Sequence, residues 1–560
     1  MKFSRLVGAA VSAASFTLAK EKPRNLARAV DVSQNGAMMM NSMATKKALW
    51  LAEAEAGLMD GALYPRLNYT KCVDGKAEAI PGDPLHTFRC KNIDLYDFIN
   101  HATLGSPTGW SYRIGSSSWG WTDPESKREF VASGMYEGTA FLEILPEGRL
   151  LHLGFLPAPS ALNLDAFWKE IRSFKHYMLI GSELADHGVQ IFDMNKLLAI
   201  DPIDAPVTFS NDKDLAGHFM DLPEGASHNV VINEEAEYGV AVGSRPVDAE
   251  CFGGLIFFDL KDPSKPVKTG CNPDDGYVHD AQCVIYRGPD KKYLGRDICY
   301  AYNEDTLTIY DVTDKANSSI ISITSYDGAS FTHQGWLLDT KWQEWLVMND
   351  EVDEVLGNGP AQDGYPVSYI WDIRSLESPK QTGIYKSTVK GVDHNLYIKD
   401  GLVYQSAYGT GFRVYDVSSI PEDPSGNGVC EVAYLDIYPE DDSSPGGGEV
   451  QFSGTWSSYA MFESGFIFIN TIERGAFLAK MTRREPCRPH SCNADNCLRA
   501  LRASNVDGRL GESQEFCGKF TASVTADVGV VPTYAASACG ENIISRVSSA
   551  CSCLPTQTAA

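Results

Sequence analysis

The chain has 560 residues, of which 43% are hydrophobic and 22% are charged, so it can bury a sizeable core and is not disordered throughout. Its 48 basic and 73 acidic residues give a formal net charge of −25. A surface this acidic repels phosphate backbones and anionic lipid, which argues against nucleic-acid partners and peripheral membrane roles. The sequence contains no apolar run as long as a membrane-spanning helix requires.

The first residues have the features of a secretory signal peptide. Lys2 and Arg5 precede an apolar stretch, Leu6 to Ala19, which is too short to span a bilayer and is rich in small residues. We therefore predict that residues 1–19 are removed and that the protein is secreted, to remain extracellular or associated with a cell wall. A mitochondrial presequence or an unstructured start is the alternative.

Residues 20–89 form an N-terminal extension that is rich in Met and Ala. Its pattern predicts one helix near Thr45–Met59. Two sequons, at Asn68 and Asn317, are acceptors for N-glycosylation if the host is a eukaryote.

The cysteine content also fits an oxidising compartment. The chain has 14 cysteines, an even number. Their local spacing favours three disulfides, Cys72–Cys90, Cys251–Cys271 and Cys283–Cys299.

A repeat runs through the middle of the chain. Seven segments share an apolar run of β-branched or aromatic residues, and six of them have an acid at the same position; they are GTAFLEI (138–144), GVQIFDM (188–194), GLIFFDL (254–260), TLTIYDV (306–312), SYIWDI (368–373), GFRVYDV (411–417) and GAFLAKM (475–481). The corresponding positions are 50, 66, 52, 61, 44 and 64 residues apart. This spacing suits one four-stranded blade with its loops, so we predict an all-β, seven-bladed β-propeller over residues 90–482.

The last repeat stops after its third strand. Residues 90–99, just before the first blade, can supply the missing fourth strand. We expect them to pair with 474–481, because closing the ring removes an exposed sheet edge.

Residues 487–560 carry seven cysteines and are predicted to form a small disulfide-rich module. Cys497–Arg502 is expected to be a short helix. The connectivity of these cysteines does not follow from the sequence.

Polar residues gather at one predicted face of the propeller. The first strand of a blade lines the central channel, and the loop entering it lies on the same face as the loop between the second and third strands. The predicted ligand-binding rim on this face consists of Trp119, Glu137, Glu170, His187, His228, His394, Trp456 and Glu473.

Four of the blades begin their first strand with histidine, at His228, His279, His333 and His394. Imidazoles beside carboxylates suit zinc, copper or manganese, so His228, His279 and His333 are candidate ligands for such an ion. The alternative is that each histidine simply joins neighbouring parts of the ring by a hydrogen bond.

Two acids are candidates for a catalytic role at the same rim, Glu304 and Glu351, as metal ligands or general bases. The neighbouring Asp353 and Glu354 are expected to lie in a solvated acidic loop.

The residues also carry a family likeness. The sequence resembles the secreted "choice-of-anchor B" proteins with LVIVD-type repeats, and the matching stretches are WGWTD (119–123), SHNVVINE (227–234), HDAQCVIY (279–286), NEDTLTIYDVTDKAN (303–317), THQGW (332–336), DHNLYIK (393–399) and DIYPED (436–441). The resemblance implies a secreted or surface-anchored propeller without an established reaction. The segment CNADNCLRALR (492–502) is similar to Cys-rich tails of secreted fungal proteins, which implies a fungal source.

These features predict a protein that binds an extracellular small-molecule, cell-wall or protein ligand through the rim. A metal-dependent secreted hydrolase or oxidase that uses the same rim is the first alternative. A structural protein of the cell wall is the second.

Overall fold

The computed structural model describes residues 35–105, 114–163, 166, 168–485, 487, 496–503, 505–506, 508–520, 528–540 and 543–554. The chain divides into two compact units, one up to Glu485 and one from Pro486 onward. The predicted signal peptide lies outside the described residues.

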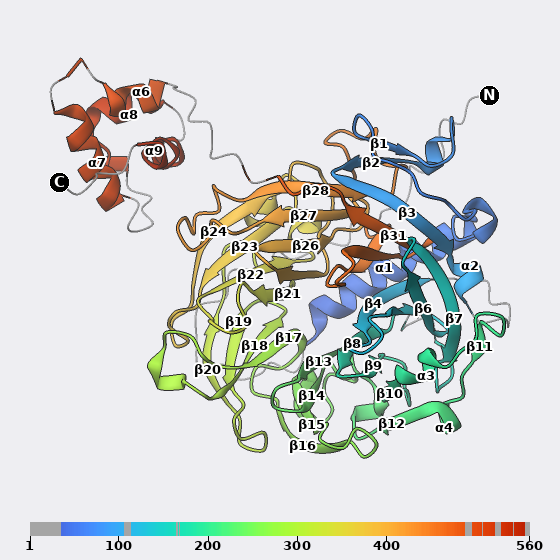
Figure 1. Ribbon diagram of the computed structural model, residues 1–560. Coiled ribbons are helices and arrows are strands. Elements are labelled where there is room, and N and C mark those ends of the chain that lie inside the picture. The colour runs from blue at the N-terminus through green and yellow to red at the C-terminus, as the bar shows by residue number, and fades with distance from the viewer. Residues whose placement is uncertain are drawn as a thin grey trace. The chain divides into compact units, whose positions relative to one another are not determined.

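The first unit is a seven-bladed β-propeller, so the predicted fold is confirmed (Figure 1). The strands of the first four blades are β4 (Gly115–Thr122), β5 (Glu129–Met135), β6 (Gly138–Leu145) and β7 (Arg149–Pro157); β8 (Glu170–Phe174), β9 (Tyr177–Gly181), β10 (Val189–Asp193) and β12 (Leu215–Phe219); β13 (Asn229–Asn233), β14 (Tyr238–Val242), β15 (Leu255–Asp259) and β16 (Val267–Asn272); and β17 (Val278–Ile285), β18 (Asp297–Asn303), β19 (Leu307–Asp311) and β20 (Ser319–Thr324). A short strand, β11 (Val207–Thr208), runs parallel to β7 and widens the first blade.

The remaining blades follow the same antiparallel order. Their strands are β21 (Thr332–Leu337), β22 (Trp345–Asp350), β23 (Val367–Asp372) and β24 (Lys380–Lys386); β25 (Leu396–Lys399), β26 (Leu402–Ser406), β27 (Phe412–Asp416) and β28 (Cys430–Asp436); and β29 (Thr455–Tyr459), β30 (Phe466–Thr471) and β31 (Gly475–Met481). Short helices α2 (His101–Leu104), α3 (Asn195–Leu198), α4 (Asn211–Asp214) and α5 (Asp353–Leu356) lie in the connections.

The middle strands of each blade are apolar on both faces because neighbouring blades cover both faces. All five residues of β14 are buried, and Val240 packs with Val278 and Tyr310 of the next blade. On its other face, Ala241 joins a cluster with Val189 of the preceding blade. The hydrophobic core therefore lies between the blades, and the continuous apolar runs of the repeats reflect this two-sided burial.

The ring closes through β3 (Ile93–Asn100), which is antiparallel to β31 and is the fourth strand of the seventh blade. This is the pairing expected for residues 90–99, except for its first residues. Cys90 and Lys91 belong to β2 (Thr87–Lys91), which pairs instead with β28 of the sixth blade and carries β1 (Lys76–Glu78) on its outer side. The segment from β1 to β3 thus enlarges one blade before it closes another.

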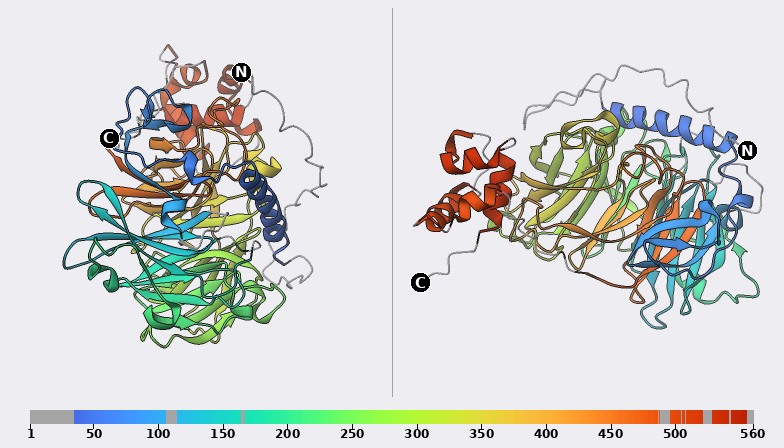
Figure 2. Two further views of the ribbon diagram at one scale, coloured as in Figure 1. Left: turned by 90° about the vertical axis from the view of Figure 1, so that its right-hand side faces the viewer. Right: turned by 90° about the horizontal axis from the view of Figure 1, so that it is seen from above.

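The helix of the N-terminal extension, α1 (Ala37–Glu55), lies across one face of the propeller (Figures 1 and 2). It begins and ends earlier than the predicted Thr45–Met59, because its N-terminus is capped by the propeller rather than by its own sequence. Its methionines Met39 and Met43 are buried in a cluster that includes residues from several blades. Flexible methionine side chains fill such an irregular surface well.

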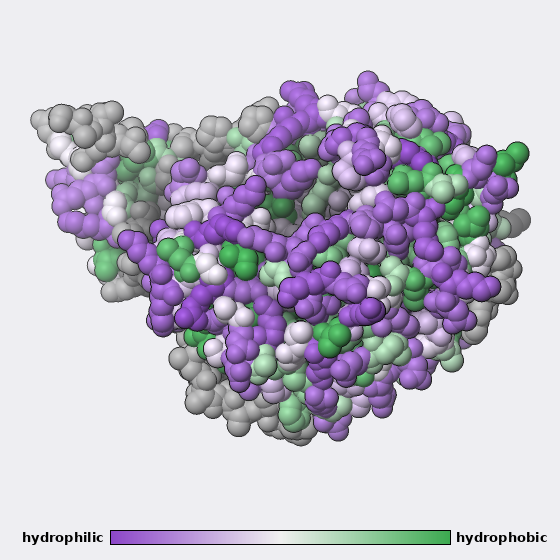
Figure 3. Space-filling view, turned by 60° about the horizontal axis from the view of Figure 1, so that its bottom comes forward, coloured by the Kyte–Doolittle hydropathy of each residue, from purple (hydrophilic) through white to green (hydrophobic). Residues whose placement is uncertain are grey.

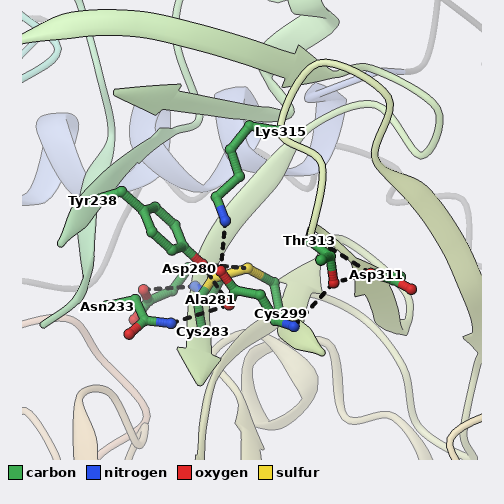
Figure 4. Close-up of a disulfide and its surroundings, with 10 residues drawn as sticks. Asn233, Tyr238, Asp280, Ala281, Cys283, Cys299, Asp311, Thr313 and Lys315 are labelled. Atoms are coloured by element: carbon green, nitrogen blue, oxygen red, sulfur yellow. Dashed lines mark hydrogen bonds and ion pairs between the residues drawn. A yellow bond between two sulfur atoms is a disulfide. The ribbon is translucent and has the colours of Figure 1, made fainter. Parts of the chain in front are cut away.

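The three disulfides expected from local spacing are present in this unit: Cys72–Cys90, Cys251–Cys271 and Cys283–Cys299. The last one joins β17 to β18 at directly opposed positions. Figure 4 shows it beside Tyr238, whose ring lies 3.9 Å below the ammonium group of Lys315.

The second unit is helical and disulfide-linked. Its described helices are α6 (Asn496–Arg502), α7 (Arg509–Phe520), α8 (Thr533–Cys539) and α9 (Ile543–Ser552). Cys497–Cys539 and Cys517–Cys551 hold it around a small core that includes Leu498, Leu501 and Val547. This matches the disulfide-rich module predicted from the cysteine density.

The face of the molecule in Figure 3 is mostly hydrophilic, with small hydrophobic patches set between polar residues. Among the described residues, no helix combines the length and apolar character that crossing a bilayer requires. The predicted glycosylation sites Asn68 and Asn317 are both exposed.

Candidate functional site

The four channel histidines form a continuous row around one end of the channel. The ring centroids of His228 and His279 lie 4.2 Å apart, those of His279 and His333 4.1 Å, and those of His333 and His394 4.5 Å. Each histidine comes from the start of the first strand of its blade, and these strands contact one another around the axis. The sequence pattern therefore located a real cluster.

The row continues with tryptophan where the blades lack histidine. Trp456 lies beside His394 at a centroid distance of 4.8 Å, and Trp168 lies beside His228 at 5.6 Å. Trp168 and Trp456 are themselves stacked at 6.4 Å. The four histidines and these two tryptophans thus form a row of adjacent side chains around this end of the channel.

The outer ring nitrogen of three histidines binds a neighbouring part of the propeller. His279 Nδ1 donates to the backbone oxygen of His333 at 2.8 Å, and His394 Nδ1 donates to that of Trp456 at 2.6 Å. His228 Nδ1 lies 2.6 Å from a carboxylate oxygen of Glu183. These bonds join adjacent blades and assign the proton to Nδ1 in His279 and His394, which leaves the lone pair on Nε2.

Burial keeps the imidazoles of His279, His333 and His394 neutral. Desolvation, followed by the neighbouring histidines, holds the pKa of His279 and of His333 well below the usual range. Desolvation lowers the pKa of His394 to about 4, although the charge of Glu351 acts in the opposite direction. Neutral imidazole is the form that binds metals.

The expectation of an open rim is wrong, because α1 covers this end of the channel. The N-terminus of α1 is capped by Glu304, whose Oε1 accepts the backbone N–H groups of Met38 at 2.7 Å and Met39 at 3.1 Å. Further along the helix, Trp50 Nε1 donates to the Phe452 carbonyl at 2.8 Å. Glu304, a candidate catalytic acid in the sequence, thus holds the helix in place.

Lys46 of α1 reaches down to the histidine row. Its Nζ lies 2.5 Å from Glu351 Oε1 and faces the rings of Tyr408, Phe452 and Trp456 at 5.8, 5.1 and 5.8 Å. Tyr408 also donates its hydroxyl to the same carboxylate oxygen. Burial alone would raise the pKa of Glu351, but Lys46 and His394 outweigh it and lower that pKa.

His333, Glu351 and His394 are the buried set with metal-ligand spacing among the described residues. One potential ligand atom from each lies within 4.8 Å of the others. The predicted set of His228, His279 and His333 shares only His333 with it. Neighbouring first strands bring the rings together, but the acid that completes the set is on the fifth blade, next to His333 and His394.

The remaining rim residues are buried parts of the ring rather than ligand-facing groups. Glu137 is buried, Glu170 accepts a hydrogen bond from Trp456 Nε1 at 3.3 Å, and Glu473 accepts one from the Gly454 backbone at 3.0 Å. His187 is fully buried, and its Nδ1 binds the Gly188 carbonyl at 2.9 Å. Desolvation lowers the pKa of His187 to about 3.

The acidic segment after β22 is buried, contrary to the expected solvated loop. Asp350 accepts hydrogen bonds from Tyr326 and from the backbone of Ser330 and Phe331. Burial raises the pKa of Asp353 and of Glu354 well above the usual range, and the neighbouring acids add to the effect. Burial therefore favours the neutral, protonated form of both side chains.

The other end of the channel carries a cavity of about 370 Å³. It lies among residues further along the same first strands, including Trp119, Arg172, Val231, Gln282 and Trp336. Trp119, the one predicted rim residue found here, is half-buried and hydrogen-bonded to Ser173 at 3.0 Å.

The walls of this cavity combine aromatic faces with charge. The Arg172 guanidinium lies 4.5 Å above the ring of Trp119 and 3.7 Å from Asp280. Exposed side chains of both signs, including Glu234, Arg287 and Lys341, stand at its margin. The cavity can thus stack against a flat face and offer hydrogen bonds around it.

Sequence reasoning missed the residues that α1 contributes, Lys46 and Trp50, and it missed Arg172. Lys46 and Trp50 carry no local signal of a site, because a lysine and a tryptophan within a predicted helix do not indicate what that helix packs against. Arg172 lies two residues after Glu170, a residue of the predicted rim. Because side chains two positions apart on a strand point to the same face, the strand pattern could have predicted that Arg172 also faces the channel.

No family model matches the sequence, and no curated protein matches it. Solved structures similar to this chain include the C-terminal WD40 domain of Sif2 (10% identity, covering 65% of this chain and 96% of that one, TM-score 0.39). The Cps50 (Swd1) β-propeller domain of Myceliophteria thermophila covers the same shares at 10% identity and TM-score 0.38. The computationally designed Ika8 protein matches at 10% identity over 65% of this chain and 82% of its own, with TM-score 0.37.

Proposed function

We propose that the protein is a secreted binding protein of the LVIVD-repeat, choice-of-anchor B type that takes its ligand in the cavity between Trp119 and Trp336. The observation that carries the proposal is this cavity, which is reached from solvent while the histidine end of the channel is covered by α1. A rigid ring of blades is well suited to hold such a site in place.

The ligand class that suits the cavity is an oligosaccharide, such as a cell-wall fragment. Trp119 and Trp336 line the cavity with half-buried rings, and the aromatic surface that Arg172 leaves uncovered can contact a sugar ring. The exposed side chains of Glu234, Arg287 and Lys341 at the margin offer hydrogen-bond donors and acceptors, and their charges include both signs. A neutral polyol matches this mixture better than a strongly charged ligand does.

Secretion accords with the chemistry of the chain. The described cysteines all take part in disulfides, which persist in oxidising compartments. The exposed sequons at Asn68 and Asn317 would carry glycans in a eukaryotic host, and a fungal source is part of the same proposal.

The test is a fluorescence titration with soluble β-glucan and chitin oligosaccharides, using the intrinsic tryptophan signal. Trp119→Ala should weaken binding at least about fivefold, because truncating an aromatic contact at a binding site costs about 1–3 kcal/mol. Trp342→Ala is the matched control, since Trp342 is 49% exposed and does not line the cavity.

Equal binding by wild type and Trp119→Ala would contradict the cavity as the site. Absence of binding to any oligosaccharide would leave a protein ligand or a structural role in the wall as the competing explanations.

A metal-dependent secreted hydrolase or oxidase is the second candidate. The observation that favours it is the buried grouping of His333, Glu351 and His394, a ligand set known from catalytic zinc sites. Zinc is the ion this set suits best, with copper or manganese as the alternatives. A substrate could reach these residues only after α1 moved, which places this candidate second.

A further inference from the structure

We propose that His333, Glu351 and His394 form a site for one zinc ion, and that the ammonium group of Lys46 competes with that ion for Glu351. The site lies beneath α1, at the other end of the channel from the oligosaccharide cavity. The inference therefore does not depend on the proposed binding function.

The distances already approach those of a metal site. His333 Nε2 lies 3.9 Å from Glu351 Oε2, and His394 Nε2 lies 3.5 Å from Glu351 Oε1. Zinc bonds of about 2.0–2.1 Å in tetrahedral geometry separate neighbouring ligand atoms by about 3.3 Å. The two histidines approach different oxygens of the carboxylate, and the three ligand atoms lie within 4.8 Å of one another. Zinc binding therefore requires the His394–Glu351 pair to close by about 0.2 Å and the His333–Glu351 pair by about 0.6 Å, through small side-chain rotations.

The polar atoms around the site are arranged for a cation. Glu351 is fully buried, and its Oε2 atom has no hydrogen-bond partner. A buried carboxylate oxygen of this kind is open to a cation. His394 donates its Nδ1 proton to the Trp456 carbonyl and so directs its Nε2 lone pair toward Glu351. An outer hydrogen bond of this kind is usual in metal-binding histidines.

Lys46 supplies a tethered positive charge to the same carboxylate. Its Nζ lies 2.5 Å from Glu351 Oε1, and both side chains are almost completely buried. Two cations cannot approach one buried carboxylate closely without strong repulsion. The helix that carries Lys46 is held independently by Glu304 and Trp50, so the lysine head can move away while α1 remains in place.

The competition predicts that removing the lysine charge improves zinc binding. Metal-free wild type and Lys46→Met are titrated with zinc chloride by isothermal calorimetry at pH 7. Lys46→Met should bind one equivalent with a Kd at least tenfold lower than wild type. Adding Glu351→Gln to that variant should abolish the gain.

Lys169→Met is the matched control. Lys169 is also fully buried near the channel, but its Nζ binds the Tyr136 carbonyl at 3.2 Å rather than a carboxylate. Its zinc affinity should equal that of the wild type.

Lys46→Met leaves Glu351 buried without its cation, which can destabilise the fold. Lys46→Gln keeps a neutral hydrogen-bond donor and replaces it if the first variant does not fold. Zinc should raise the melting temperature of either variant more than that of the wild type. Equal zinc affinity in the wild type and the Lys46 variants, or absence of zinc binding in all of them, would overturn the proposal. Binding that survives Glu351→Gln would overturn the assigned ligands.

Discussion

The two ring nitrogens of each channel histidine have different surroundings. In His279 and His394, Nδ1 binds a backbone carbonyl of the next blade, while Nε2 remains on the side of the channel. The joining role and the metal-binding role are therefore compatible, since they use different atoms. From the sequence alone, joining neighbouring blades and binding a metal ion were alternative roles for these histidines, because a residue pattern does not distinguish the two ring nitrogens.

Arg413 illustrates how a buried ion pair of the propeller contributes to stability. Arg413 is 1% exposed and pairs with Glu431 at 2.5 Å. Arg413→Leu should lower the free energy of unfolding by about 3–5 kcal/mol, because it leaves a buried acid without its partner. Urea denaturation followed by circular dichroism measures the change. The control Arg374→Leu breaks an exposed pair with Asp372 and should cost about 1 kcal/mol or less. Similar losses in both variants would contradict this account.

At the scale of elements, α1 makes the two ends of the channel different. It covers the end with the histidines, while the end with the cavity is open to solvent. Its ends are bound to different blades, through Glu304 near its start and through Phe452 near Trp50. A second acid, Glu53, is buried near the helix end and accepts a hydrogen bond from Ser453. A helix in this segment could be expected from the sequence, but its position over the channel depends on residues hundreds of positions away.

The contact of α1 with the propeller should depend on pH through Glu53. Burial, reinforced by Glu473 and Glu440 and opposed by Arg474, raises the pKa of Glu53 from 4.5 to about 8. The folded state therefore binds the proton more tightly than the unfolded state, so this contribution is full below about pH 4.5 and is lost as the pH rises toward 8. The loss is at most about 1.4 kcal/mol per pH unit.

Comparison with Glu53→Gln isolates this contribution. The difference in unfolding free energy between wild type and Glu53→Gln, measured by urea denaturation from pH 4.5 to 8, should change steadily with pH. Glu55→Gln, an exposed acid on the same helix, should follow the wild type. A pH-independent difference for Glu53→Gln would refute the assignment.

For the whole molecule, stability depends on the closure of the ring by β3. Phe98 pairs with Phe477 of β31, and their ring centroids lie 4.4 Å apart. Phe98→Pro removes this packing and the hydrogen bond that the Phe98 N–H donates to Asp97 Oδ1, so it should cost at least about 3 kcal/mol and promote aggregation through the exposed edge of β31. Thermal denaturation with light scattering measures both effects.

The control is Val267→Pro, at the first residue of the outer strand β16, where the side chain is 61% exposed. Proline is tolerated at such positions. Equal destabilisation by the two substitutions would mean that closure is not the weak point of the ring.

The sequence by itself determined the propeller, its seven blades, the three local disulfides and the histidine at the start of four blades. These features are periodic or local. Each repeat buries the same apolar run, and the two cysteines of each of these disulfides are at most 20 residues apart in the sequence. Only the tertiary structure decided which residues share a site. It placed Lys46 on Glu351, 305 positions away, and it left Trp119 and Arg172 together at the open end of the channel. Such contacts depend on where one helix packs and on which end of a strand a residue occupies, and neither is encoded in a local pattern.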